Sequence, residues 1–142
     1  MSSGFMQAIH RASQLATQGF EANYSDANIT ARQLQILAAI EANKGASQSQ
    51  IVAITGVDRS TLAEVVSRLS GRKLIQRRRS KSDARAYILK LTEAGRGVLS
   101  DGLPHIASTE RDLLAVLSTE DRETLLRLLK ALVRAHETAS RD

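Results

Sequence analysis

Basic side chains that could bind a polyanion are concentrated in one short segment of the sequence. Eight of the twenty Lys and Arg residues lie between Gly71 and Lys90, where the one acid is Asp83. They are Arg72, Lys73, Arg77, Arg78, Arg79, Lys81, Arg85 and Lys90. This segment carries a formal charge of +7, whereas the other residues, 12 basic and 14 acidic, sum to −2. Such a patch is typical of nucleic-acid-binding proteins, although a charge run alone is more simply a solvated loop.

The sequence offers little for catalysis or metal binding. It has no Cys, which excludes disulfides, thiolate metal sites and thiol redox switches. The histidines His10, His105 and His136 lie far apart, and none belongs to a spacing that binds a metal or activates a nucleophile. We therefore expect no enzymatic activity, no metal and no cofactor.

The length of 142 residues and the apolar content of 42% fit one compact domain, or two small lobes that share a core. The first ten residues lack the basic start and apolar core of a signal peptide, and no run of about 18 apolar residues occurs. We expect a cytoplasmic protein with no membrane partner.

Hydrophobic spacing predicts four helices before the basic segment. Apolar residues recur at intervals of three and four from Phe5 to Phe20. Thr30 and Ser47 begin capping boxes that open a second helix and a short third one. The predicted buried residues are Leu34, Leu37 and Ile40 in the second helix and Ile51, Val52 and Ile54 in the third. Gly56 turns the chain, and Asp58 is the N-cap expected for a fourth helix. The apolar stripe of that helix is Leu62, Val65, Val66 and Leu69. Two short helices across such a turn form a helix-turn-helix.

The face of the fourth helix opposite its apolar stripe carries small polar residues flanked by arginines. Steps of about 100° per residue place these side chains opposite or beside the stripe. They are Arg59, Ser60, Thr61, Glu64, Ser67 and Arg68. In a major groove, Ser and Thr bind base edges or phosphates and Arg forks onto guanine. Amphipathicity alone fits an ordinary solvent-facing helix equally well.

The basic segment predicts a β-hairpin. Its strands are Leu74–Arg79 and Ala86–Leu91, and its tip is Ser80–Arg85. A basic hairpin directly after a helix-turn-helix favours one surface for double-stranded DNA, with the helix in the major groove and the hairpin in the minor groove. We predict a mainly α fold with a small β-hairpin wing, a winged helix-turn-helix over residues 30–91.

Helices on both sides of this lobe, in residues 1–29 and 92–142, are predicted to form a homodimer. After Thr92 a heptad-like seam runs to Leu117, interrupted once by Glu110. A last helix, starting near residue 118, carries leucines over more than half of its circumference, which is more apolar surface than one small core can cover. The predicted interface residues are Ile9, Leu113, Leu117, Leu125, Leu129 and Leu132.

Several motifs together resemble the MarR family of winged-helix regulators, over nearly the whole chain. They are Val57–Leu62, Leu69 with Leu74–Arg77, Asp83–Arg85 and Leu89–Gly95. The resemblance implies an intertwined dimer that binds a near-palindromic operator, with repression as the family default. It makes Arg85 the minor-groove arginine and Asp83 its orienting partner. The implied DNA contacts otherwise are Ser49, Arg59, Ser60, Thr61, Ser67 and Arg68, joined by the basic hairpin residues Arg77, Arg78, Arg79 and Lys81. Glu64 stays ambiguous, because a carboxylate accepts from cytosine but repels phosphates.

The resemblance also implies a pocket for a small aromatic or anionic effector between the dimerisation helices and the DNA-binding lobe. The polar residues expected near it are His10, Arg11, Gln14 and Arg32. One departure concerns the turn after the fourth helix, where the family has Gly and this chain has Lys73. Either Lys73 takes the left-handed conformation at a cost of about 1 kcal/mol, or Gly71 takes over the turn.

Two other kinds of protein would use the same basic surface. An architectural DNA-binding protein would bind without a defined operator. An RNA-binding module would need exposed aromatic side chains for stacking, and the chain has only two Phe and two Tyr residues.

Overall fold

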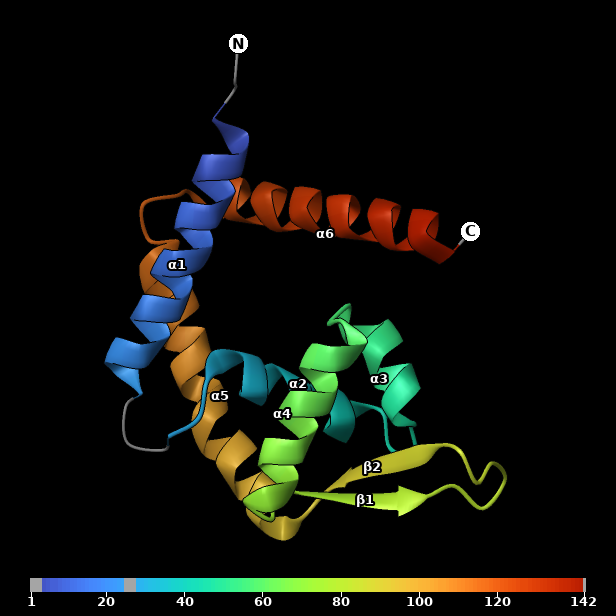
Figure 1. Cartoon of the computed structure of the whole chain (residues 1–142). Coiled ribbons are helices and arrows are strands. Elements are labelled where there is room, and N and C mark those ends of the chain that lie inside the picture. Colours follow the sequence, from blue (N-terminus) through green and yellow to red (C-terminus); the bar gives the residue numbers. More distant parts are fainter. Residues whose placement is uncertain (1–3, 25–27, 142) are drawn as a thin grey trace.

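A computed structural model describes residues 4–24 and 28–141 of the chain. Its helices and strands follow the predicted order, with one two-stranded antiparallel sheet (Figure 1). The elements are α1 (Phe5–Asn23), α2 (Ala31–Ala42), α3 (Gln48–Thr55), α4 (Arg59–Gly71), β1 (Ile75–Arg79), β2 (Tyr87–Leu91), α5 (Glu93–Leu113) and α6 (Thr119–Arg141). The predicted fold class, mainly α with a hairpin wing, is therefore confirmed.

The core lies among α2, α3, α4 and the hairpin, and it is closed by Phe20 of α1 and Leu99 of α5. The predicted stripe of α4 is buried except for Val65, which is half-buried. In α2 the predicted residues Leu34, Leu37 and Ile40 are buried, and so is Ile36, which the spacing had not indicated. The expectation that Ile54 of α3 faces inward is wrong in the single chain, because its side chain is 49% exposed.

The predicted caps set the start of the helices α2, α3 and α4. Thr30 and Ser47 each form a complete capping box, and the Asp58 side chain accepts a hydrogen bond from the Thr61 amide. Between α3 and α4, Gly56 has a φ of 70°, which a side chain disfavours. These local signals orient α4 relative to α3.

The turn from α4 into the wing is left-handed at Lys73, whose φ is 61°. The Lys73 amide donates to the carbonyl of Ser70 and the Leu74 amide to that of Leu69, both at 2.9 Å. This is the hydrogen-bond pattern of a Schellman motif. Gly71 does not take over the turn, because it is the last residue of α4. The chain therefore keeps a strained non-Gly residue at the base of the wing.

Helix α5 joins the lobe to α1. A β-carbon at Gly95 would collide with the backbone carbonyl of Leu74, so α5 can begin this close to the hairpin only with glycine there. Further along α5, Asn23 of α1 donates to the Thr109 hydroxyl at 3.2 Å. The Tyr24 ring stacks on His105 with centroids 4.2 Å apart. These contacts hold the C-terminal end of α1 against α5.

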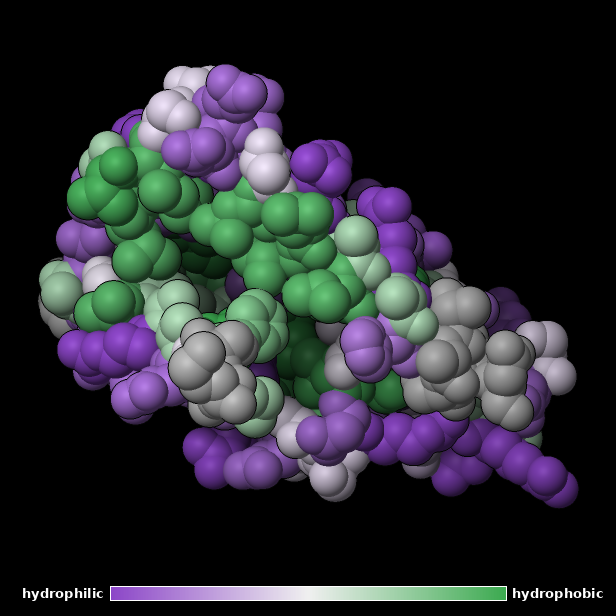
Figure 2. Space-filling model, turned by 90° about the horizontal axis from the view of Figure 1, so that it is seen from above, coloured by the Kyte–Doolittle hydropathy of each residue, from purple (hydrophilic) through white to green (hydrophobic). Residues whose placement is uncertain are grey.

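The N-terminal half of α1 extends away from this body, and α6 runs above it toward the turn at Gly56, where a β-carbon would lie 2.7 Å from Glu137 Oε1 (Figure 1). Figure 2 shows hydrophobic residues gathered in a patch on this side of the molecule. The exposed large apolar residues of the two helices are Phe5, Met6, Ile9, Leu15, Leu125, Leu126, Leu128, Leu129, Leu132 and Val133. Of the predicted interface residues, only Leu113 and Leu117 are half-buried in the single chain. The heptad-like seam expected to reach Leu117 ends earlier, because α5 ends at Leu113 and a turn precedes α6.

Candidate nucleic-acid interface

A hollow of about 290 Å³ lies where α3, the start of α4 and the hairpin meet. We call it the wing hollow. The residues that matter in its lining are Ser49, Val52, Arg59, Arg77, Arg85 and Tyr87. Four of these were predicted to contact DNA, and they come from three separate elements. The fold thus gathers three arginines and a serine at one opening, a suitable arrangement for binding phosphate oxygens.

The predicted contact residues of α4 lie on its outer face. Arg59, Ser60, Glu64, Ser67 and Arg68 are exposed, and Thr61 is half-buried. This face adjoins the wing hollow at its N-terminal end, through Arg59. The helix therefore presents a polar surface next to the hairpin, as the proposed docking into a major groove requires.

Asp58 organises the two hydroxyl residues at the start of α4. Its carboxylate accepts hydrogen bonds from the Thr61 amide, the Thr61 hydroxyl and the Ser60 hydroxyl, each at 2.8 Å. The bonds from Thr61, followed by that from Ser60, lower the pKa of Asp58 from 3.8 to about 2. Because both hydroxyl hydrogens are engaged, Ser60 and Thr61 present oxygen lone pairs outward and can accept from base amino groups.

Glu64 and Arg68 bind each other. The Arg68 Nη2 atom lies 2.9 Å from Glu64 Oε1, one turn of α4 apart, and both side chains are largely exposed. An exposed pair of this kind contributes little to stability. It does hold Arg68 along the helix axis and offsets the charge of Glu64, so Glu64 has a structural role whether or not it reads a base.

The hairpin register divides the three consecutive arginines between two faces. Arg77 is opposite Leu89 and Arg79 is opposite Tyr87, so these residues share one face of the sheet. The guanidinium carbons of Arg77 and Arg79 lie 4.4 and 5.5 Å from the centroid of the Tyr87 ring. Arg79 also donates to the carbonyl of Ala84 at 3.0 Å, across the loop of the wing. The Tyr87 ring thus contacts two cations on the face that meets the wing hollow.

Arg78 points the other way. It is opposite Ile88 in the register and lines a different cavity, behind the hairpin. Lys81 is exposed in the loop. The structure therefore separates Arg78 from the cluster of predicted contacts, while Arg77 and Arg85 belong to it.

Asp83 acts on Arg85 through the backbone. Its Oδ1 atom accepts from the Arg85 amide at 3.0 Å, and its carbonyl accepts from the Ala86 amide at 3.0 Å. The Ser80 hydroxyl accepts from the Ser82 and Asp83 amides on the other side of the loop. This network shapes the tip from which the Arg85 side chain extends, which agrees with an orienting role for Asp83.

The residues predicted for an effector lie at two places. His10, Arg11 and Gln14 are exposed on α1, where Arg11 Nη1 donates to Gln14 Oε1 at 3.2 Å. Arg32 lines a cavity of about 530 Å³ between α2 and the turn before α4. Asp58 lines the same cavity and feels the charge of Arg32. Of the four residues predicted for an effector, only Arg32 therefore lies next to the start of α4.

Sequence reasoning missed two residues of the wing hollow whose side chains can form hydrogen bonds, Tyr87 and Gln48. Tyr87 was assigned only to a strand, yet strand alternation together with the correct register would have placed it beside Arg77 and Arg79. Gln48 also lines the hollow, and its Oε1 atom is buried without a hydrogen-bond partner among the described residues. No signal in the sequence distinguishes Gln48 from an ordinary residue of the first helical turn.

The described residues hold no cluster of three or more metal-ligating side chains. His105 stacks on Tyr24, and His136 Nδ1 lies 2.9 Å from the carbonyl of Leu132. Within residues 4–24 and 28–141, no helix has the length and hydropathy needed to cross a membrane. Within the described residues, the arginine-rich wing hollow beside α4 is thus the feature that points to a function, the binding of a polyanion.

Comparison with known proteins gives transcriptional regulators, one of them solved with DNA. Residues 27–86 match the MarR family. The HTH-type transcriptional repressor NicR of Pseudomonas putida is 28% identical over 131 residues, which cover 92% of this chain and 83% of NicR. The structure of the PcaV transcriptional regulator of Streptomyces coelicolor with its natural ligand superimposes with a TM-score of 0.85, at 30% identity and 91% coverage of each chain. The transcriptional repressor CouR, bound to a 23-mer DNA duplex, gives a TM-score of 0.82 at 29% identity, covering 92% of this chain and 96% of CouR. This chain belongs to the MarR family of winged helix-turn-helix transcriptional regulators.

Proposed function

We propose that this regulator is a cytoplasmic repressor that binds a near-palindromic operator as a homodimer and is released by a small-molecule effector. The observation that carries the DNA-binding part is the convergence of Ser49, Arg59, Arg77 and Arg85 on the wing hollow. Three cations, one from α4 and two from the hairpin, would together bind the phosphates between two grooves. NicR and CouR are both named as repressors, which supports repression rather than activation.

Each protomer would bind one half-site. The exposed face of α4 would enter the major groove, where Arg59 and the oxygen atoms of Ser60 and Thr61 meet base edges. The wing would follow the adjacent minor groove, with Arg85 at its tip. The phosphate contacts position the protein, and the residues of α4 supply the sequence preference.

The dimer is proposed from the unpartnered apolar faces of α1 and α6. Six Leu and Val side chains of α6 are between 37% and 54% exposed, which is unusual for a monomeric protein. A second copy would bury this surface and set the spacing between the two recognition helices.

Selection of bound fragments from sheared genomic DNA, followed by a salt titration, tests the proposal. We expect the selected site to be bound at least about a thousandfold more tightly than a random duplex at physiological salt. Equal affinity for both duplexes at every salt concentration would instead identify an architectural DNA-binding protein. Preference for single-stranded RNA over both duplexes would contradict DNA binding altogether.

The effector is proposed to be aromatic or anionic and to pair with Arg32 or Arg11. Arg32 is the stronger candidate, because its cavity reaches Asp58 at the start of α4, so an anion there would compete for Arg32. PcaV, which was solved with its natural ligand, supports ligand control in this family. Operator release by a panel of aromatic acids should be weakened in Arg32→Ala or Arg11→Ala, and a normal response in both variants would contradict these positions.

A further inference from the structure

One polar atom of the wing hollow is buried without a hydrogen-bond partner. It is Oε1 of Gln48, the first residue of α3, and no group among the described residues donates to it. The guanidiniums of Arg59, Arg77 and Arg85 line the same hollow, and each carries several N–H donors. A buried acceptor that lies beside such donors without receiving one points to a hydrogen bond that forms in another state of the protein.

The pairing of the chain beside β2 brings Gln48 next to Tyr87. Ser47 forms an isolated antiparallel bridge with Ile88, so Gln48 and Tyr87, each one step further along, are adjacent. The guanidinium carbon of Arg77 lies over the Tyr87 ring, 4.4 Å from its centroid. Of the arginines that line the hollow, Arg77 is thus the one that a ring contact holds beside the neighbour of Gln48.

We propose that Gln48 is a positioning residue for DNA binding, whose Oε1 atom accepts a hydrogen bond from Arg77 when a DNA phosphate enters the wing hollow. The proposal rests on the DNA-binding part of the proposed function, because the phosphate belongs to the bound state. A guanidinium that donates to Gln48 and lies on the Tyr87 ring is fixed at two points. Its remaining donors then face the phosphate oxygens in one orientation.

The charge of the wing hollow explains why this hydrogen bond is absent without DNA. Three arginines line the hollow and, among the described residues, no acid does. Like charges at one opening repel one another and favour separate, hydrated guanidiniums. A bound phosphate offsets this repulsion and displaces water, and a hydrogen bond is stronger in the drier site that results.

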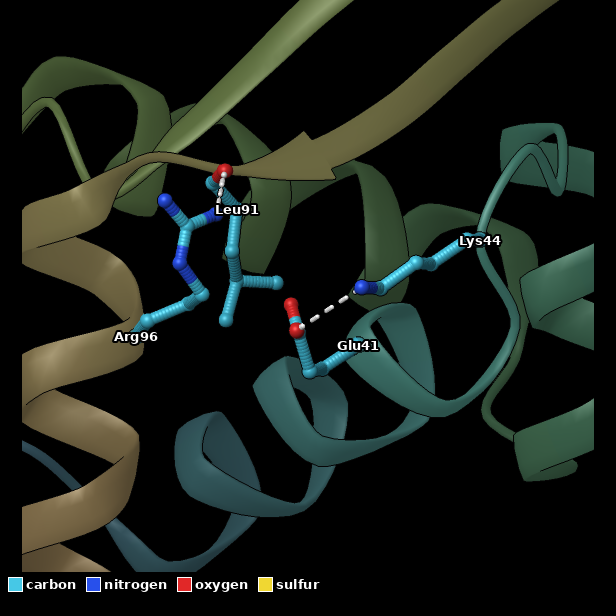
Figure 3. Close-up of polar contacts among 4 residues, drawn as sticks. All are labelled: Glu41, Lys44, Leu91 and Arg96. Atoms are coloured by element: carbon cyan, nitrogen blue, oxygen red, sulfur yellow. Dashed lines mark hydrogen bonds and ion pairs between the residues drawn. The ribbon is translucent and has the colours of Figure 1, made fainter.

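Two cations elsewhere in the lobe already have their acceptors in the free protein. Arg96 Nη1 donates to the carbonyl of Leu91 at 3.2 Å, and Lys44 Nζ lies 3.7 Å from Glu41 Oε1 (Figure 3). These groups line a different cavity. The wing hollow differs because its acceptor and its cations lie together without bonding, which is the arrangement expected where pairing waits for a ligand.

A double-mutant cycle tests the pairing, with the full-length protein and the operator duplex selected from genomic DNA. Gln48→Met keeps the length of the side chain but removes the acceptor, and it should weaken operator binding about tenfold. In an Arg77→Met background the same change should have no further effect, because the donor is already gone. In Arg59→Met and Arg85→Met backgrounds it should still weaken binding about tenfold, because those effects are independent.

Gln76→Met is the matched control. Gln76 is exposed and is opposite Lys90 in the register, on the face of the hairpin away from Arg77, so this change should leave operator affinity unaltered. Thermal unfolding of the free protein separates positioning from support of the fold. Removing an acceptor that is buried without a partner should leave the melting temperature of Gln48→Met equal to or above that of the wild type.

The outcomes that would overturn the proposal are distinct from failure of the proposed function. An unchanged affinity of Gln48→Met, an equal loss in the Arg77→Met background, or coupling to Arg59 or Arg85 instead would each overturn the pairing. A lowered melting temperature with losses that add in every background would assign Gln48 to the fold. Because every duplex carries phosphates, the coupling should also appear with a random duplex. Equal wild-type affinity for operator and random duplex would overturn operator recognition, while the cycle would still decide the role of Gln48.

Discussion

The DNA-binding lobe and the helices α1 and α6 use their apolar residues in opposite ways. In the lobe, Leu34 and Leu62 have no exposed surface, whereas Leu126 and Val133 of α6 are each 54% exposed. Both regions contain amphipathic helices with similar spacing. The difference shows that the core of the lobe is completed within one chain, with Phe20 of α1 and Leu99 of α5, while the N-terminal half of α1 and α6 present a surface that only another chain would bury.

The largest effect is expected from breaking the α6 surface. Leu129→Asp places a charge in the middle of the apolar face and should give a monomer whose operator affinity is at least about a hundredfold lower, because the two half-sites are no longer linked. Light scattering and fluorescence anisotropy measure the two effects. Arg127→Asp, opposite this face on the helical wheel, is the control and should stay dimeric. A monomeric Leu129→Asp protein with full operator affinity would contradict the proposal that operator binding requires a dimer formed through α6.

A smaller effect is expected from the tip of the wing, in the region that needs no partner. Arg85→Ala removes the proposed minor-groove contact and should lower operator affinity about tenfold, while dimerisation and the melting temperature stay the same. Anisotropy at physiological salt tests this result. An unchanged affinity would show that the wing tip does not contact DNA.

Tyr87 provides a finer test of the same face. Tyr87→Leu removes the ring that both Arg77 and Arg79 contact and should weaken operator binding about twofold to fivefold, the value of one or two exposed cation–π contacts. Tyr87→Phe keeps the ring and should bind like the wild type. If both variants lose affinity equally, the hydroxyl rather than the ring is required.

The smallest effect concerns the stability of the lobe alone. Lys73→Gly relieves the left-handed backbone at the base of the wing and should raise the free energy of unfolding by up to about 1 kcal/mol, offset in part by the greater chain entropy of glycine. Urea denaturation measures the change, and operator affinity should not alter. A destabilised variant would show that the Lys73 side chain makes a stabilising contact worth more than the strain.

Much of the fold was predictable because its signals are local. The capping boxes at Thr30 and Ser47, the N-cap at Asp58 and the apolar stripe of α4 each lie within a few residues of the structure they specify. The basic hairpin was located for the same reason. Ile36 and Ile54 were assigned wrongly, since whether a helix buries one more residue or exposes it depends on its neighbours in space.

The site was predictable as a set of residues but not as an arrangement. The sequence alone establishes that Arg77, Arg78 and Arg79 are three consecutive cations. Only the pairing with the second strand decides that Arg77 and Arg79 share a face with Tyr87 while Arg78 lies on the other face with Ile88, because strand alternation assigns faces only once the register is known.

By itself, then, the sequence determined the order of the elements, the location of the positive charge and the residues available to contact DNA, since these follow from local spacing and composition. The tertiary structure decided which of those residues meet. It brought Ser49, Arg59 and Arg85 to one hollow and left the apolar face of α6 exposed. The physical reason is that these contacts join elements distant along the chain, and packing rather than local propensity determines them.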